Sequence, residues 1–112
     1  MSDWINVVKT EELVPGQACL VDVDDTLIAI FNIDGDYFAI ENVCSHDGSE
    51  LLIEGLESTM RVNGDEITCP HHGARFCIKT GEALCPPAYE PINKFPTRVV
   101  NGMVQIIDNR RD

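Results

Sequence analysis

Apolar and polar positions along this chain form short runs typical of β-strands, and no stretch repeats with the period of a long helix. Turn signals separate the runs: Asp34-Gly35 and Asn101-Gly102 favour two-residue hairpin connections, and Glu11–Leu13 favours a short helical turn. The predicted strands are Trp4–Val8, Ala18–Val23, Leu27–Ile33, Tyr37–Ile40, Glu66–Cys69, Arg75–Ile78, Phe95–Val100 and Met103–Ile107. This density of strand signals predicts an all-β fold, a small antiparallel sandwich or barrel.

Length and charge narrow the class of protein. The chain has 112 residues, which corresponds to one domain, 1–112, with enough residues for a real core. Eight Lys and Arg face 19 Asp and Glu, so the formal net charge is −11. Nucleic acids and anionic membranes bind basic surfaces, so we expect neither as a partner. An acidic surface instead favours a basic protein partner.

Localisation signals and cysteine usage point to a reducing compartment. Residues Met1–Thr10 include Asp3 and contain no apolar run of signal-peptide length, and the apolar run Leu27–Phe31 is far too short to span a bilayer. We therefore expect a cytoplasmic, soluble protein. The five cysteines are an odd number, and in a reducing compartment they are expected to be thiols or metal ligands rather than disulfides.

Two loops interrupt the strand pattern and carry the candidate chemistry. They are Cys44–Ser49 and Cys69–Gly73, and together they contain all three histidines and two of the five cysteines. Packing alone does not explain this clustering. Gly48 and Gly73 permit the backbone angles that tight loops need.

The spacing of the cysteines and histidines predicts a metal site. Each loop offers one thiolate and one imidazole, as Cys44-x-His46 and as Cys69-x-x-His72. Two Cys and two His can hold a single structural zinc, although zinc sites usually begin with paired cysteines. The mixed pairing also suits a [2Fe–2S] cluster with two thiolates on one iron and two imidazoles on the other.

Beyond the ligands, Gly73–Phe76 and Thr80–Leu84 complete a pattern that resembles the Rieske iron–sulfur family over nearly the whole chain. It is most similar to the soluble Rieske ferredoxins of bacterial ring-hydroxylating oxygenases. The resemblance implies a Rieske fold with a two-loop cluster-binding subdomain at about residues 42–87. It also implies one [2Fe–2S] cluster per chain, with Cys44 and Cys69 on one iron and His46 and His72 on the other.

The chain departs from parts of the family in two ways. The spacer Asp47–Thr68 has 22 residues, longer than is usual, and we expect the excess near Leu56–Asn63 as a surface hairpin. The respiratory branch has a disulfide between the two ligand loops, but its positions correspond here to Ser49 and His71, so that bond is absent.

The respiratory branch also directs a Ser and a Tyr hydroxyl at the cluster sulfurs. Here the corresponding residues are Ala74 and Phe76, which carry no hydroxyl. We therefore expect a midpoint potential at the low end of the Rieske range, about −150 mV.

The other cysteines and His71 are expected to have structural roles. Cys19 and Cys77 fall in predicted strands and are expected to be buried. Cys85 precedes Pro86-Pro87, in what the resemblance implies is a third loop that shields the cluster from water. His71 is not a ligand in the family pattern and is expected to orient its loop.

Two acidic groups and one aromatic residue complete the candidates. Asp22, Asp24 and Asp25 form the first group, and Glu50, Glu54 and Glu57 form the second. Each group either steers a basic partner or is a solvated surface. Trp4 is expected in the core.

These observations predict an electron carrier and not an enzyme. The resemblance implies a monomer that accepts one electron from a flavin-dependent ferredoxin reductase and passes it to a terminal oxygenase. A catalytic oxygenase needs a second iron site with two further histidines, and only His71 remains. Two alternatives stay open: a Rieske subunit of another oxidoreductase complex, such as the small subunit of a nitrite reductase, and a zinc-binding interaction module.

Overall fold

The computed structural model describes residues 4–43, 45, 51, 62–63, 65–69, 73–85 and 90–108. Within these residues the chain forms antiparallel strands and one 3₁₀ helix. The elements are β1 (Trp4–Lys9), η1 (Thr10–Glu12), β2 (Ala18–Val23), β3 (Thr26–Ile33), β4 (Asp36–Glu41), β5 (Val62–Asn63), β6 (Glu66–Thr68), β7 (Arg75–Cys77), β8 (Ala83–Cys85), β9 (Lys94–Phe95), β10 (Thr97–Val100) and β11 (Met103–Ile107). The all-β prediction is confirmed.

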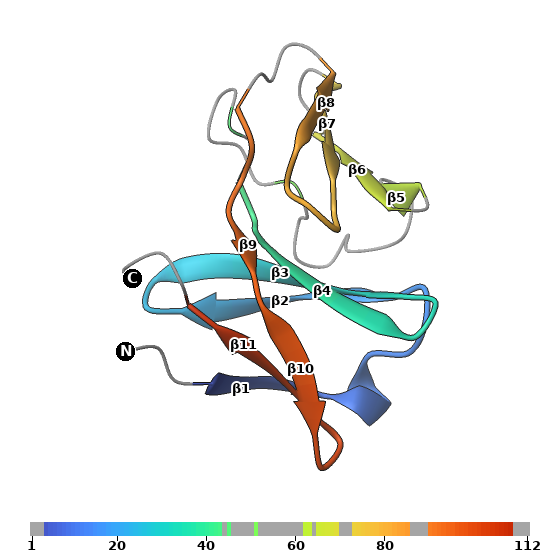
Figure 1. Ribbon diagram of the computed structural model, residues 1–112, viewed down its shortest axis with the longest axis vertical. Helices are drawn as coiled ribbons and strands as arrows, with labels where there is room; N and C mark the ends of the chain where they lie inside the picture. The colour runs from blue at the N-terminus through green and yellow to red at the C-terminus, as the bar shows by residue number, and fades with distance from the viewer. Residues whose placement is uncertain are drawn as a thin grey trace.

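The strands are arranged in three sheets, as Figure 1 shows. A three-stranded sheet has the order β1-β11-β10, and a four-stranded sheet has the order β2-β3-β4-β9. These two form the base of the molecule. A third sheet, β5-β6-β7-β8, lies over the opposite face of the β2-β3-β4 sheet and carries the second ligand loop.

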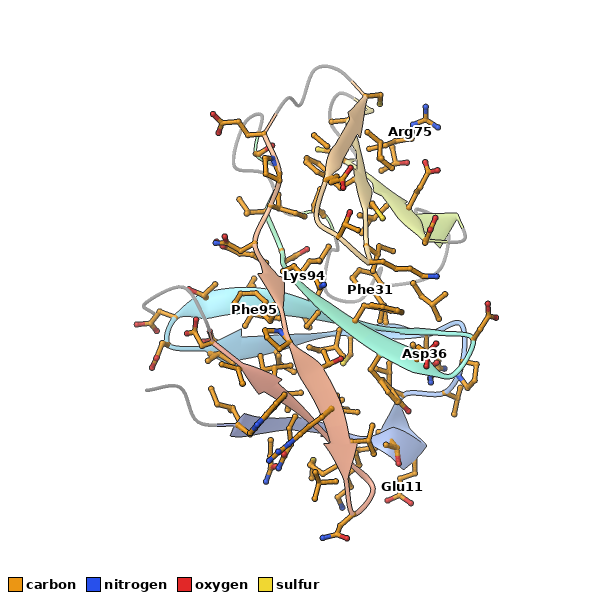
Figure 2. All side chains as sticks on the ribbon, in the orientation of Figure 1. Glu11, Phe31, Asp36, Arg75, Lys94 and Phe95 are labelled. Atoms are coloured by element: carbon orange, nitrogen blue, oxygen red, sulfur yellow. The ribbon has the colours of Figure 1, made fainter. Side chains whose placement is uncertain are left out.

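Strand β3 is the centre of the molecule because both of its faces are covered. Ile28 and Ile30 contribute to the core between the two base sheets, whereas Ala29 and Phe31 contribute to the core beneath the third sheet. Phe31 is labelled in Figure 2. All four side chains are at most 1% exposed. A strand that is buried on both faces reads as a nearly continuous apolar run, which explains the sequence of this segment.

The two cores hold different parts of the molecule together. The base core contains Leu13, Ile28, Ile30, Ala39, Phe95, Val104 and Ile106. The upper core contains Ala29, Phe31, Ile40, Leu51, Ile67, Cys69, Ala74, Phe76, Ile78 and Ile92. Burying one such large apolar side chain contributes about 1.5–3 kcal/mol. The upper core therefore fixes the third sheet to the base, and the ammonium of Lys79, 5.6 Å from the ring centre of Phe38, adds a contact between them.

Pro96 divides the strand that was predicted at Phe95–Val100. The structure has two strands there, because proline has no N–H to donate to a ladder. β9 pairs with β4, and β10 pairs with β11, so the chain passes from one base sheet to the other at this residue. The prediction of one continuous strand was wrong in this respect.

The predicted hairpin turns are confirmed by their backbone angles. Asp34 and Gly35 have φ values of 54° and 94°, and Asn101 and Gly102 have 51° and 75°. A positive φ at both central residues defines the type of hairpin turn whose twist matches that of the strands. Asp24 and Asp25 make a third turn of this kind, and the N–H of Asp25 donates to Asp22 Oδ1 at 3.0 Å. The first acidic group thus forms the β2–β3 turn.

Some local predictions need correction. Strands β5 and β8 were not predicted, because two- and three-residue strands give no periodic signal. Trp4 is half-buried rather than in the core, and the guanidinium carbon of Arg98 lies 4.2 Å from the centre of its ring. The helical turn predicted at Glu11–Leu13 is the 3₁₀ helix η1. The described part of the chain contains no helix that is long and apolar enough to cross a membrane.

Candidate metal centre

Cys69 follows the last residue of β6 directly and is 1% exposed. It belongs to the upper core, together with apolar side chains of β3, β4 and the third sheet. Of the four predicted ligands, Cys69 is the one that the structure describes. Cys44, His46 and His72 lie outside the described residues, so their assignment as ligands stays a prediction.

The β6–β7 hairpin frames the second ligand loop. The N–H of Cys69 donates to the carbonyl of Ala74 at 2.7 Å, and the N–H of Gly73 donates to the carbonyl of Cys69 at 3.2 Å. Gly73 has a φ of 75°, in the region that favours glycine. Backbone hydrogen bonds therefore fix the residues on both sides of positions 70–72.

The surroundings of Cys69 fit a metal-bound thiolate. Ala74, Phe76 and Ile67 are each 0% exposed and belong to the same core as Cys69. An isolated thiolate is costly in such an apolar environment unless a cation neutralises it. A buried cysteine in a tight loop, with His72 three residues further on, is thus suited to hold an iron of a [2Fe–2S] cluster.

The residues beside Cys69 also bear on the electronics of the site. Ala74 and Phe76 correspond to the Ser and the Tyr that carry hydroxyl groups in the respiratory branch, and both are completely buried in the upper core. Neither side chain can donate a hydrogen bond. The structure therefore provides no hydroxyl donor at these two positions.

The first ligand loop is attached to the segment that precedes β9. Ser45, between the predicted ligands Cys44 and His46, donates its hydroxyl hydrogen to the carbonyl of Glu90 at 2.6 Å. Leu51, which follows this loop, is 0% exposed in the upper core. The sequence analysis did not single out Ser45, because its partner is 45 positions away along the chain.

Residues 90–93 form a strap that connects both ligand-bearing regions, and we call them the 90–93 strap. Its Asn93 donates its side-chain N–H to Glu41 Oε1 at 2.7 Å, and the N–H of Glu41, at the end of β4, donates to the carbonyl of Asn93 at 2.9 Å. At the other side, the N–H of Ile92 donates to the carbonyl of Gly81 at 2.8 Å. The strap therefore joins β4, which leads into the first ligand loop, to the third sheet.

The outer face of the third sheet carries a polar group beside the second ligand loop. Arg75 Nε donates to Cys85 Sγ at 3.5 Å, and Arg75 Nη1 lies 3.6 Å from Glu66 Oε1. The hydrogen bond from Arg75 lowers the pKa of the Cys85 thiol, while desolvation acts in the opposite direction. The same contact with Cys85, followed by Glu66, raises the pKa of Arg75.

The structure corrects the roles expected for the other cysteines. Cys19 and Cys77 lie in strands as predicted, but both are partly exposed rather than buried. Cys85 ends strand β8 and does not lie in a loop. The described residues contain no group of three or more metal-binding side chains. His71, Pro86, Pro87, the insertion expected near Leu56–Asn63 and the group Glu50, Glu54 and Glu57 lie, in whole or in large part, outside the described residues.

Comparison with known proteins agrees with this geometry. Residues 3–96 match the Rieske [2Fe-2S] domain. The biphenyl dioxygenase ferredoxin subunit of Pseudomonas sp. strain KKS102 is 38% identical over 103 residues, which are 92% of this chain and 89% of that protein.

Solved structures resemble the fold over nearly its whole length. The Sphingomonas yanoikuyae B1 ferredoxin superposes with a TM-score of 0.79 at 28% identity, covering 93% of this chain and 97% of that one. A ferredoxin solved as a complex of reduced oxygenase and oxidized ferredoxin in carbazole 1,9a-dioxygenase also gives a TM-score of 0.79 at 28% identity, covering 92% and 91%. With the domain match over residues 3–96 and the buried Cys69 at the β6–β7 hairpin, these similarities show that the chain belongs to the Rieske [2Fe–2S] family.

Proposed function

We propose that this protein is a one-electron carrier of a ring-hydroxylating oxygenase system, which takes an electron from a flavin-dependent reductase and delivers it to the terminal oxygenase. The observation that carries the proposal is the Rieske match over residues 3–96 in a chain whose relatives are ferredoxin components of dioxygenases. The structural relative solved with its oxygenase supports the terminal partner. The reductase follows from the need for an electron donor.

The ligand set of this function consists of Cys44, His46, Cys69 and His72, one pair from each loop. When bound, a Rieske cluster supplies a one-electron redox couple. Cys69 is held for this role by its backbone hydrogen bond to Ala74 and by its place in the upper core. The apolar side chains around it exclude water from this side of the site.

The chain carries no substrate chemistry of its own, so its further properties concern docking. We propose a cytoplasmic monomer with one domain, 1–112. The net charge of −11 suits a basic docking face on the reductase or the oxygenase. Attraction between opposite charges increases the rate of encounter, which suits a carrier that must bind two partners in turn and release both.

The first experiment determines the cofactor and its ligands. Anaerobically purified protein should contain iron and acid-labile sulfide in the ratio of a [2Fe–2S] cluster and show the EPR spectrum of a Rieske centre after reduction. Cys69→Ser and His72→Ala should lose this spectrum. Cys77→Ser, which removes a thiol that is not a predicted ligand, should keep it. A colourless protein that contains zinc contradicts the proposal.

The second experiment tests electron transfer. With NADH, a flavin-dependent reductase and a ring-hydroxylating oxygenase from the same source organism, product formation should require the wild-type protein. Cys69→Ser should not support turnover, and Cys77→Ser should support it at the wild-type rate. Equal product formation with and without the wild-type protein contradicts the role of carrier.

A further inference from the structure

The outer face of the third sheet has a line of side-chain contacts that ends on the second ligand loop. We propose that Arg75 and Cys85 act as a pair of positioning residues that fix the backbone of Gly73, and through it the end of the loop that bears Cys69 and His72. The proposal rests on the ligand set proposed above. It gives a role to a cysteine and an arginine that take no part in binding the cluster.

The line of contacts crosses three strands. It starts at Glu66 on β6, continues through the guanidinium of Arg75 on β7 at 3.6 Å, and reaches Cys85 Sγ on β8 at 3.5 Å. From there the Cys85 thiol donates to the carbonyl of Gly73 at 3.6 Å. A thiol can satisfy both contacts, because its hydrogen is donated to Gly73 while its sulfur accepts from Arg75. Figure 2 shows Arg75 on the side of the third sheet that faces away from the base.

A glycine at position 73 needs such a restraint more than a residue with a side chain would. It has no side chain and a φ of 75°, so rotation about its backbone bonds is less restricted than for other residue types. Its N–H already donates to the carbonyl of Cys69. A hydrogen bond to its own carbonyl fixes the remaining peptide plane, and the residue that precedes it is the predicted ligand His72.

The side chain of Cys85 supplies a hydrogen-bond donor that the backbone of the next two residues cannot supply. Cys85 is the last residue of β8 and pairs with Arg75, and the register shifts between Arg75 and Phe76. The chain continues with Pro86 and Pro87, which have no N–H. These two residues therefore cannot donate backbone hydrogen bonds toward Gly73, and the Cys85 thiol donates to the carbonyl of Gly73 instead.

These contacts are suited to orientation and contribute little to global stability. The side chain of Arg75 is 52% exposed, so solvent screens its attraction to Glu66. Outer contacts that orient ligands nevertheless have large effects on metal retention, of about 10–100-fold. We therefore expect substitutions here to loosen the loop and leave the unfolding transition of the whole domain nearly unchanged.

The test compares wild-type protein with Cys85→Ala, Arg75→Ala, the double variant and Cys85→Ser. Three measurements are made: the rate of iron release to a chelator, the EPR spectrum of the reduced protein, and deuterium uptake by the peptide that contains residues 69–74. Cys77→Ala is the matched control, since it removes a thiol from the same sheet that forms no hydrogen bond with any described side chain or with Gly73. Deuterium uptake reports on the loop whether or not the cluster is retained.

Cys85→Ala should release iron about tenfold faster than wild type, with a broadened EPR spectrum and faster deuterium uptake at residues 69–74. Arg75→Ala should have effects in the same direction, and the double variant should not exceed the larger single effect, because the two residues act on one carbonyl. Cys85→Ser, which keeps a donor on a shorter side chain, should recover part of the wild-type behaviour.

The proposal is overturned if Cys85→Ala behaves like Cys77→Ala, if Cys85→Ser is no better than Cys85→Ala, or if the two single effects multiply in the double variant. Failure of the proposed ligand set gives a different result. In that case wild-type protein lacks the Rieske spectrum, and deuterium uptake alone decides whether Arg75 and Cys85 hold the loop.

Discussion

Among the glycines that the structure describes, Gly81 is the one at which an added methyl group should cause the largest loss of stability. It has a φ of 80°, its N–H donates to the carbonyl of Cys77 at 2.7 Å, and its carbonyl accepts from the N–H of Ile92 at 2.8 Å. A Cβ atom at this position would lie 2.3 Å from the carbonyl oxygen of Ile92. That oxygen is part of the backbone of the 90–93 strap, so it cannot move aside as a flexible side chain would.

The magnitude for Gly81→Ala follows from two costs. Placing an L-residue in the left-handed region costs about 1–2 kcal/mol. Displacing packed backbone to relieve the overlap costs about 1–3 kcal/mol more. The total of about 2–5 kcal/mol corresponds to a fall of about 8–20 °C in the thermal midpoint, at about 4 °C per kcal/mol for a domain of this size.

Gly35→Ala separates the two costs and is the matched control. Gly35 has a φ of 94°, and a Cβ atom there would meet no atom within 4 Å. This variant carries the backbone strain without the overlap, so its midpoint should fall by about 4–8 °C. Both variants gain the same small benefit from a less flexible unfolded chain, which cancels in the comparison.

The assay is circular dichroism of cluster-loaded protein heated at one scan rate, with the loss of visible absorbance followed in parallel. Gly81→Ala should unfold at a lower temperature than Gly35→Ala and lose its cluster faster, because the strap also holds Ser45 through Glu90. If the two variants have midpoints within about 3 °C of each other, less than 1 kcal/mol separates them. The close approach of Gly81 to Ile92 would then not limit the fold.

Three further predictions concern the site and its surface. Phe76→Tyr adds a hydroxyl to a buried ring that shares the upper core with Cys69. If this hydroxyl forms a hydrogen bond to a cluster sulfur that is stronger by about 1–2 kcal/mol in the reduced state, the midpoint potential should rise by about 40–90 mV. An unchanged potential in a redox titration would show that the hydroxyl does not reach the cluster. Because the hydrogen bond from Arg75 lowers the pKa of the Cys85 thiol, Arg75→Ala should raise that pKa and move the alkylation of Cys85 by iodoacetamide to higher pH, as measured by mass spectrometry; an unchanged profile would assign the shift to another group. Electron transfer to the oxygenase should slow as the NaCl concentration is raised, since the screening length falls from about 10 Å at 0.1 M to about 3 Å at 1 M. If stopped-flow rates do not depend on salt, the acidic surface serves only to keep the protein soluble.

The sequence determined the fold class and the candidate chemistry because both depend on local patterns. Asp34-Gly35 and Asn101-Gly102 predict hairpins through the backbone angles that these residue types adopt, and the structure has those turns. The alternation of residues predicts the strands of the base. The Cys-x-His and Cys-x-x-His spacings predict a metal site because only one or two residues separate the members of each pair along the chain.

Sequence patterns did not predict short elements and partial burial. β5 and β8 have two and three residues, and their pairing depends on the neighbouring strands. Cys77 and Trp4 were expected to be buried from residue type, but the edge position of β1 and the outer face of β7 leave them partly exposed.

Only the tertiary structure decided what holds the ligand loops. The contacts of Ser45 with Glu90, of Gly81 with Ile92, and of Cys85 with Gly73 join residues that are between 11 and 45 positions apart. No periodicity or spacing rule connects such pairs, because each contact forms only when segments far apart in the sequence fold side by side: the first ligand loop with the 90–93 strap, Gly81 with the same strap, and β8 with β7 in the third sheet. The sequence therefore determines which atoms are available as ligands, and the packing of the upper core determines how firmly the loops that carry them are held.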